Sequence, residues 1–111
     1  MIAAIEAHQD EIGELCRRYG VERLEAFGAA ATEAFDEETS DVDVVVLFSD
    51  EVRRSPGYAD TYLDFAWDLE ALLERDVDLV TERSIQNPYF RNSVDASRQV
   101  IYEQRSPEAS A

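Results

Sequence analysis

An apolar run that begins with two aspartates constrains the fold of this chain more than any other feature of its sequence. Residues 41–48 read Asp-Val-Asp-Val-Val-Val-Leu-Phe. A strand with one face in solvent alternates apolar and polar residues, whereas this segment is apolar at every position after Asp43. We therefore predict a central strand that is buried on both faces and carries Asp41 and Asp43 at its start.

The two aspartates are placed to act together. Residues two apart on a strand point to the same face, about 7 Å apart along the chain, so Asp41 and Asp43 project to one side. Unpaired carboxylates at the head of a buried strand are costly, or their pKa values shift. A divalent cation would neutralise them, and Mg²⁺ fits because it takes oxygen ligands and leaves coordination for water and phosphate.

A second strand with the same spacing follows later in the chain. Residues 76–80 read Asp-Val-Asp-Leu-Val. If the two strands are neighbours, Asp76 or Asp78 completes a cluster of three carboxylates. Such clusters serve two-metal phosphoryl transfer, in which one ion activates the attacking hydroxyl, the other holds the triphosphate, and an acid can take the proton.

Helical patterns separate these strands, so we expect a small α/β fold. A strand that runs into Gly28 and a following helix start is typical of phosphate-binding turns. The expected elements are an amphipathic helix from the N-terminus to Gly20, a strand over 21–27, a turn and short helix over 28–32, a loop with Ser55, Pro56 and Gly57, a helix over 59–73, a helix opened by Asn87-Pro88, and a strand over 100–102 that closes the core.

The composition bounds the function. The 111 residues have room for one domain, which we expect over 1–104, with 105–111 as a disordered tail. Acidic residues outnumber basic ones 25 to 10, the net charge is −15, and every basic residue is arginine. Such a field repels a phosphate backbone, so we expect no direct nucleic-acid binding; metal ions or a positively charged protein fit better. The acidic, lysine-free composition also raises the hypothesis of a high-salt cytoplasm.

Several residues outside these motifs have side chains that often serve special roles. Cys16 is predicted to be a buried apolar residue, and His8 a surface residue without a role. Arg53 and Arg54 could contact phosphate, although loop arginines in an acidic chain usually offset nearby acids. Tyr58 and Trp67 would form a partner surface if both were exposed. Because no apolar stretch approaches membrane-spanning length, we expect a cytoplasmic protein with no membrane contact.

The motifs, taken in order, resemble the DNA polymerase beta superfamily of nucleotidyltransferases. Residues 27–32, Phe-Gly-Ala-Ala-Ala-Thr, followed by 40–46, Ser-Asp-Val-Asp-Val-Val-Val, are similar to that superfamily's Gly-Ser, spacer and Asp-x-Asp signature. Residues 77–80 look like the strand that carries its third acid. Residues 87–91, Asn-Pro-Tyr-Phe-Arg, and 100–103, Val-Ile-Tyr-Glu, are similar to the closing helix and strand of minimal nucleotidyltransferases found as antitoxins beside HEPN-domain toxins.

The resemblance implies a fold and a reaction. It implies a small mixed β-sheet flanked by helices, as in the polymerase beta palm, with two Mg²⁺ ions and ATP, and transfer of AMP to a tyrosine of a partner HEPN-domain toxin. Asp41, Asp43 and Asp78 would be metal ligands and catalytic residues, with Asp78 also the candidate general base. Gly28, Ala29 and Thr32 would lie at the nucleotide, with Gly28 as the backbone turn under the phosphates.

Three departures from the family pattern leave a second function open. Ala29 stands where a serine would offer a hydroxyl to the triphosphate, and Glu33 replaces a glycine and adds negative charge. Eleven residues, 30–40, separate Ala29 from Asp41, one more than usual. The alternative is therefore a catalytically impaired antitoxin that neutralises its toxin by binding alone. Transfer to a small molecule such as an aminoglycoside is disfavoured because no second domain is present to hold that substrate.

Overall fold

The computed structural model describes residues 2–31 and 41–104. Thr32, Glu33, the acidic segment 36–38 and the predicted tail 105–111 lie outside the described residues. A four-stranded mixed sheet is the centre of the fold, in the order β3-β2-β1-β4. β2 pairs antiparallel with β1 and parallel with β3, and β4 pairs antiparallel with β1. The predicted mixed sheet flanked by helices is confirmed.

The elements follow one another with short connections. Their bounds are α1 Ala3–Ala7, α2 Gln9–Tyr19, β1 Val21–Ala26, the 3₁₀ turn η1 Gly28–Ala31, β2 Val42–Phe48, α3 Asp50–Arg53, α4 Tyr58–Leu73, β3 Val77–Thr81, the 3₁₀ turn η2 Glu82–Ser84, α5 Pro88–Ser97 and β4 Gln99–Glu103.

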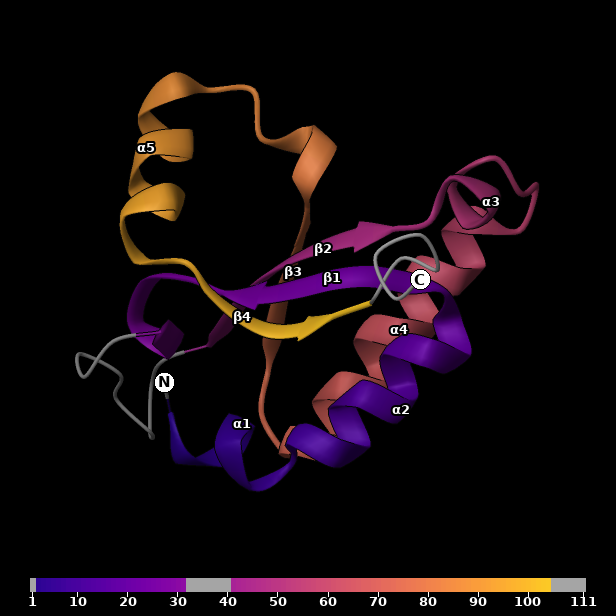
Figure 1. Cartoon of the computed structure of the whole chain (residues 1–111), viewed down its shortest axis with the longest axis horizontal. Coiled ribbons are helices and arrows are strands. Elements are labelled where there is room, and N and C mark those ends of the chain that lie inside the picture. Colours follow the sequence, from indigo (N-terminus) through magenta and orange to yellow (C-terminus); the bar gives the residue numbers. More distant parts are fainter. Residues whose placement is uncertain (1, 32–40, 105–111) are drawn as a thin grey trace, which may run out of the picture.

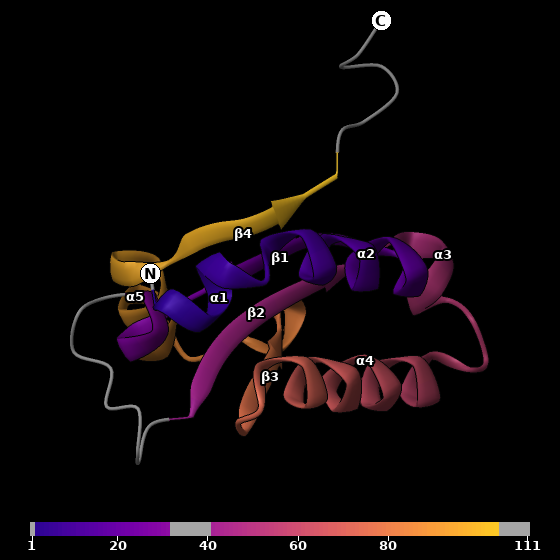
Figure 2. The ribbon, with the colours of Figure 1, turned by 90° about the horizontal axis from the view of Figure 1, so that it is seen from below.

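Helices cover both faces of the sheet. Figure 1 shows α1, α2 and α4 on one side and α5 on the other, and Figure 2 shows α2 and α4 running beside each other. Alternate residues of β2 point to opposite faces of the sheet. Val44 and Phe48 pack in the large core under α2 and α4, whereas Val45 packs with Phe27 and Val94 under α5. The burial of both faces explains why β2 is apolar almost throughout.

The N-terminal region differs from the single predicted helix. The chain breaks at His8, between α1 and α2, where φ is −118° and ψ is 20°. The His8 ring nitrogen Nδ1 donates to the carbonyl of Ala4 at 2.8 Å, and this bond replaces a backbone bond at the end of α1. The predicted cap is confirmed: Gly20 has φ 71° and its N–H donates to Cys16 O. Cys16 is buried, as predicted.

The segment after β2 also differs from prediction. The expected loop begins with the short helix α3, because the Ser49 hydroxyl accepts from Val52 N at 3.2 Å and caps it. The Arg53 guanidinium donates to Phe48 O and to the Asp50 carboxylate, so Arg53 stabilises this turn from within. Neither of these two Arg53 contacts is with Gly28 or Ala29, the predicted phosphate turn.

The C-terminal elements match prediction with one exception. Asn87 caps α5 by accepting from Tyr89 N at 2.8 Å and Phe90 N at 3.3 Å, ahead of the predicted proline. β4 forms at the sheet edge, but Val100 is 49% exposed and does not close the core as predicted, because on an edge strand only one face is covered.

Tyr58 and Trp67 do not form a joint surface. Tyr58 packs edge-to-face on Phe48 with ring centroids 5.6 Å apart, whereas Trp67 is 74% exposed. Within the described residues, no helix is long and apolar enough to cross a membrane.

Candidate active site

The sheet register brings the predicted acids together. β2 and β3 run parallel with Asp43 opposite Asp78, so both side chains leave the same face of neighbouring strands. Neighbouring strands lie about 4.8 Å apart. Asp76 lies before β3, where its carbonyl accepts from Val42 N at 3.0 Å. The sequence left Asp76 and Asp78 as alternatives for the third acid. The register selects Asp78, because Asp78 and not Asp76 pairs with Asp43.

The three carboxylates act on one another electrostatically. Burial raises the pKa of the Asp43 carboxyl, and the negative charges of Asp78 and then Asp41 raise it further. Asp43 is half-buried, whereas Asp41 and Asp78 are exposed. The arrangement is one inner acid flanked by two outer acids, and ionised Asp43 is unfavourable in it without a neutralising partner.

The carboxylates do not converge tightly. Across residues 2–31 and 41–104, no three histidine, cysteine, aspartate or glutamate side chains gather closely enough to hold a metal ion. The chemistry of the donors nevertheless fits a hard cation, because all three are carboxylates and the negative charges of Asp78 and Asp41 act on Asp43. Asp41, Asp43 and Asp78 would be the residues that hold such an ion.

Gly28 brings the chain close against Asp43. Its φ is 61°, in the left-handed region that favours glycine. A Cβ at this position would lie 3.2 Å from Asp43 Oδ2, so a side chain would crowd the carboxylate. The preceding residue is tied to the same place, because Phe27 N donates to Asp43 O at 3.0 Å. The predicted phosphate turn and the acidic strand are therefore neighbours, with Ala29 half-buried in η1.

Ser97 contacts the predicted phosphate turn, and the sequence did not reveal this contact. It is the last residue of α5, and its Oγ accepts a hydrogen bond of 2.8 Å from Gly28 N. The two residues are 69 positions apart. No motif marks Ser97, and only the packing of α5 beside η1 identifies it.

An ion-pair network behind the turn was also missed. The Arg98 guanidinium holds Glu25 with two hydrogen bonds, at 3.1 and 2.8 Å, and binds Glu82 at 2.7 Å. These side chains are largely buried, with exposures of 17% for Arg98 and 9% for Glu25. Next to it, Gln99 Nε2 donates to Ala31 O at 3.0 Å. The junction of α5 and β4 is thus fastened to β1, η2 and η1.

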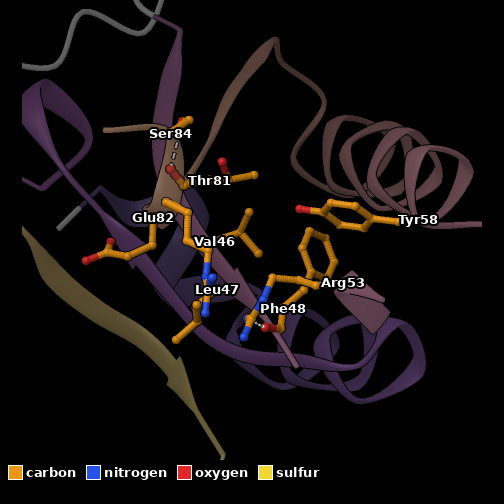
Figure 3. A pocket seen from close by; sticks show the side chains of 9 residues that line it. Val46, Leu47, Phe48, Arg53, Tyr58, Thr81, Glu82 and Ser84 are labelled. Atoms are coloured by element: carbon orange, nitrogen blue, oxygen red, sulfur yellow. Dashed lines mark hydrogen bonds between the residues drawn. The ribbon is translucent and has the colours of Figure 1, made fainter. Parts of the chain in front are cut away.

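A separate cavity of about 360 Å³ lies at the opposite ends of β2 and β3. Figure 3 shows Arg53 and Tyr58 on one side of it and Glu82 and Ser84 on the other. It is lined by Val46, Leu47, Phe48, Arg53, Tyr58, Thr81, Glu82, Arg83 and Ser84. Of the candidate residues, Arg53 lines this cavity, whereas the three aspartates do not, because they lie at the starts of these strands. The carboxylates therefore lie apart from the cavity.

A family model decides the identity of the fold. The model described as "nucleotidyltransferase domain" matches residues 12–101. The chain belongs to this family. The nucleotidyltransferase domain is also 36% identical over 78 residues, 70% of this chain and 74% of the relative, to a candidate protein adenylyltransferase from Methanocaldococcus jannaschii. A second candidate protein adenylyltransferase from the same organism is 32% identical over 82 residues, 74% of this chain and 78% of that relative.

Solved structures show the same fold. The nucleotidyltransferase domain resembles a candidate minimal nucleotidyltransferase with a TM-score of 0.67 and 30% identity, covering 85% of this chain and 89% of that one. It also resembles a chain from the complex of a tri-AMPylated Shewanella oneidensis HEPN toxin with its MNT antitoxin, with a TM-score of 0.61, 20% identity, and coverage of 90% and 73%. At that identity the second likeness establishes the fold alone.

Proposed function

We propose that this nucleotidyltransferase domain is an antitoxin that transfers AMP from ATP to a tyrosine of a HEPN-type toxin, with two Mg²⁺ ions at Asp41, Asp43 and Asp78. The observation that carries the proposal is the register of β2 and β3, which sets Asp43 opposite Asp78 beside the positive-φ turn at Gly28. Nucleotidyl transfer requires several carboxylates that hold metal ions beside a backbone turn that binds the phosphates.

The relatives support the substrate and the partner. Two relatives are named as candidate protein adenylyltransferases, which act by moving AMP to a protein. One similar structure is of a toxin–antitoxin with AMP-PNP, and another contains an AMPylated HEPN toxin with an MNT antitoxin. The net charge of −15 is suited to a positively charged protein partner. We place the reaction in the cytoplasm, where ATP is available.

The residues of the site have separate tasks in this reaction. A toxin tyrosine oxygen attacks the α-phosphorus of ATP, a new P–O bond forms, and pyrophosphate leaves with the bonding electron pair. Bound Mg²⁺ would stabilise charge on the phosphates and lower the pKa of the attacking hydroxyl. Asp78 is exposed at the edge strand β3, where an incoming hydroxyl can reach it, and it accepts the tyrosine proton. Gly28 permits the close approach of the triphosphate.

Two features favour the alternative of neutralisation by binding alone. Ala29 offers no hydroxyl to the triphosphate, and across the described residues the carboxylates are not gathered into a metal-binding group. An occluding antitoxin needs the fold and the partner surface but no turnover. The two functions differ in whether neutralisation depends on Asp78.

The test is a transfer assay with the cognate toxin, ATP and Mg²⁺. We expect an AMP-sized mass on a toxin tyrosine, which Asp41→Asn or Asp78→Asn abolishes while the thermal midpoint is retained. Asp60→Asn is the matched control, because Asp60 is an exposed aspartate on α4 and should leave transfer unchanged. If the wild type and Asp78→Asn neutralise the toxin equally with no mass change, the antitoxin acts by occlusion.

A further inference from the structure

The Gly28 turn already holds one hydroxyl oxygen. Gly28 N donates to Ser97 Oγ at 2.8 Å, and the same glycine has its Cβ position 3.2 Å from Asp43 Oδ2. Gly28 therefore contacts the Ser97 hydroxyl through its amide and faces the Asp43 carboxylate at its Cα, so one residue links the hydroxyl to the central acid of the site.

The proton of that hydroxyl is weakly engaged. Ser97 Oγ donates to the carbonyl of Ser93 at 3.4 Å, well beyond the ordinary length of about 2.7 to 2.8 Å for such a bond. A phosphate oxygen would be a stronger acceptor, because bonds to charged groups are shorter and about twice as strong. Ser97 can turn its proton to phosphate while its oxygen still accepts from Gly28 N.

The fold fixes Ser97 in place. The next residue, Arg98, is bound to Glu25 and Glu82, and Gln99 donates to Ala31 O in the same turn. These contacts fasten the end of α5 to β1, η2 and η1. A hydroxyl that is held before the ligand arrives loses little entropy on binding, which makes it effective for positioning.

We propose that Ser97 is a phosphate-positioning residue, whose hydroxyl donates to the triphosphate of the bound nucleotide and supplies from α5 the hydroxyl that Ala29 lacks. The inference rests on the proposed nucleotide site and adds a residue to it. In this account the departure at Ala29 does not impair the site, because a second segment of the chain provides the missing donor.

A purely structural role for Ser97 makes a different prediction. If Ser97 only satisfies the Gly28 amide, its loss weakens the turn, and Ala29→Ser raises the affinity of wild type and of Ser97→Ala by the same factor. If Ser97 contacts phosphate, the two hydroxyls serve the same group, and Ala29→Ser raises the affinity more in Ser97→Ala than in wild type. The difference between these two gains separates the two roles.

The experiment is calorimetric titration with Mg²⁺ and AMP-PNP, an ATP analogue that resists hydrolysis. We expect Ser97→Ala to weaken binding about tenfold, since one bond to a charged acceptor is lost. Ser97→Thr, which keeps the hydroxyl, should bind within about threefold of wild type, and Ser93→Ala, which keeps the backbone carbonyl, should be unchanged. Ala29→Ser should raise the affinity more in Ser97→Ala than in wild type.

Two results would overturn the inference. Ser97→Ala with wild-type affinity would show that the hydroxyl does not contact the nucleotide. Weakened binding by Ser97→Ala with an equal gain from Ala29→Ser in this variant and in wild type, together with a lower thermal midpoint, would assign Ser97 a structural role. A wild type that binds no AMP-PNP with Mg²⁺ would refute the nucleotide site itself. That outcome is distinguishable, because no variant would then show a binding heat.

Discussion

Loss of Arg98 should destabilise this domain more than loss of any exposed arginine. Arg98→Met keeps the side-chain length and removes the charge, so it breaks the bonds to Glu25 and Glu82 that tie α5 to the sheet. Arg83→Met is the matched control, because Arg83 is exposed on η2.

The size of the stability loss depends on the ion-pair partners that Glu25 and Glu82 keep when Arg98 is replaced. Breaking a buried ion pair costs about 3 to 5 kcal/mol when a charge is left unpaired. Here Glu25 retains Arg23 at 2.9 Å, and Glu82 retains Arg91 at 3.0 Å. Arg98 is also partly accessible to solvent, so screening reduces the effect. We expect a loss of about 2 kcal/mol, or about 10 °C in thermal midpoint, against less than about 0.5 kcal/mol for Arg83→Met.

The loss should also depend on pH. Burial acts to raise the pKa of the Glu82 carboxyl, but hydrogen bonds from Arg98 and Arg91 outweigh it and hold that pKa below the usual 4.5. A carboxyl with a lowered folded-state pKa adds stability above its unfolded-state pKa, and this stability disappears as pH falls through the folded-state value. The difference between wild type and Arg98→Met should therefore be largest near neutral pH and shrink in acid.

Urea unfolding followed by circular dichroism measures both effects across a pH series. If Arg98→Met were as stable as Arg83→Met at neutral pH, the ion pairs of Arg98 would not be what holds α5 to the sheet. A large loss that does not change with pH would refute its electrostatic origin.

Three further predictions concern other parts of the molecule. Burial, then repulsion from Asp78 and Asp41, raises the pKa of Asp43, and a raised folded-state pKa costs stability once pH rises through it. In metal-free buffer Asp43→Asn should thus stabilise the fold near neutral pH and lose this gain in acid; equal urea midpoints at neutral pH would contradict it. Burial raises the pKa of the Cys16 thiol to about 12, so this thiol should react with Ellman's reagent only after unfolding, and rapid labelling of the native protein would disprove its burial. With a net charge of −15, the thermal midpoint should rise with salt, whereas a midpoint independent of salt would mean that the acids are compensated locally and would remove the high-salt hypothesis.

The sequence predicted the acidic site because the site depends on short-range patterns. A period of two places Asp41 and Asp43 on one face, and the apolar run forces their strand into the middle of the sheet. The equal spacing of the second acidic strand then leaves two choices for the third acid. Only the register of β2 and β3 decides for Asp78.

The sequence could not predict contacts between distant segments. Ser97 and Gly28 are 69 residues apart, and a serine at a helix end carries no signature of its own. The same holds for Arg98, whose partners Glu25 and Glu82 lie on β1 and η2. The break at His8 was hidden because apolar residues on both sides of it keep helical spacing, while a side-chain bond to Ala4 O ends α1.

The proposed transfer of AMP depends most on metal and nucleotide binding at the three carboxylates. Electron paramagnetic resonance with Mn²⁺ as the probe, in the presence of AMP-PNP, counts the bound ions directly. We expect two Mn²⁺ per chain in the wild type and in Asp60→Asn, and fewer, more weakly bound ions in Asp43→Asn, because Asp43 is the inner acid between Asp41 and Asp78. Indistinguishable binding by wild type and Asp43→Asn would contradict the metal site and, with it, the proposed transfer of AMP.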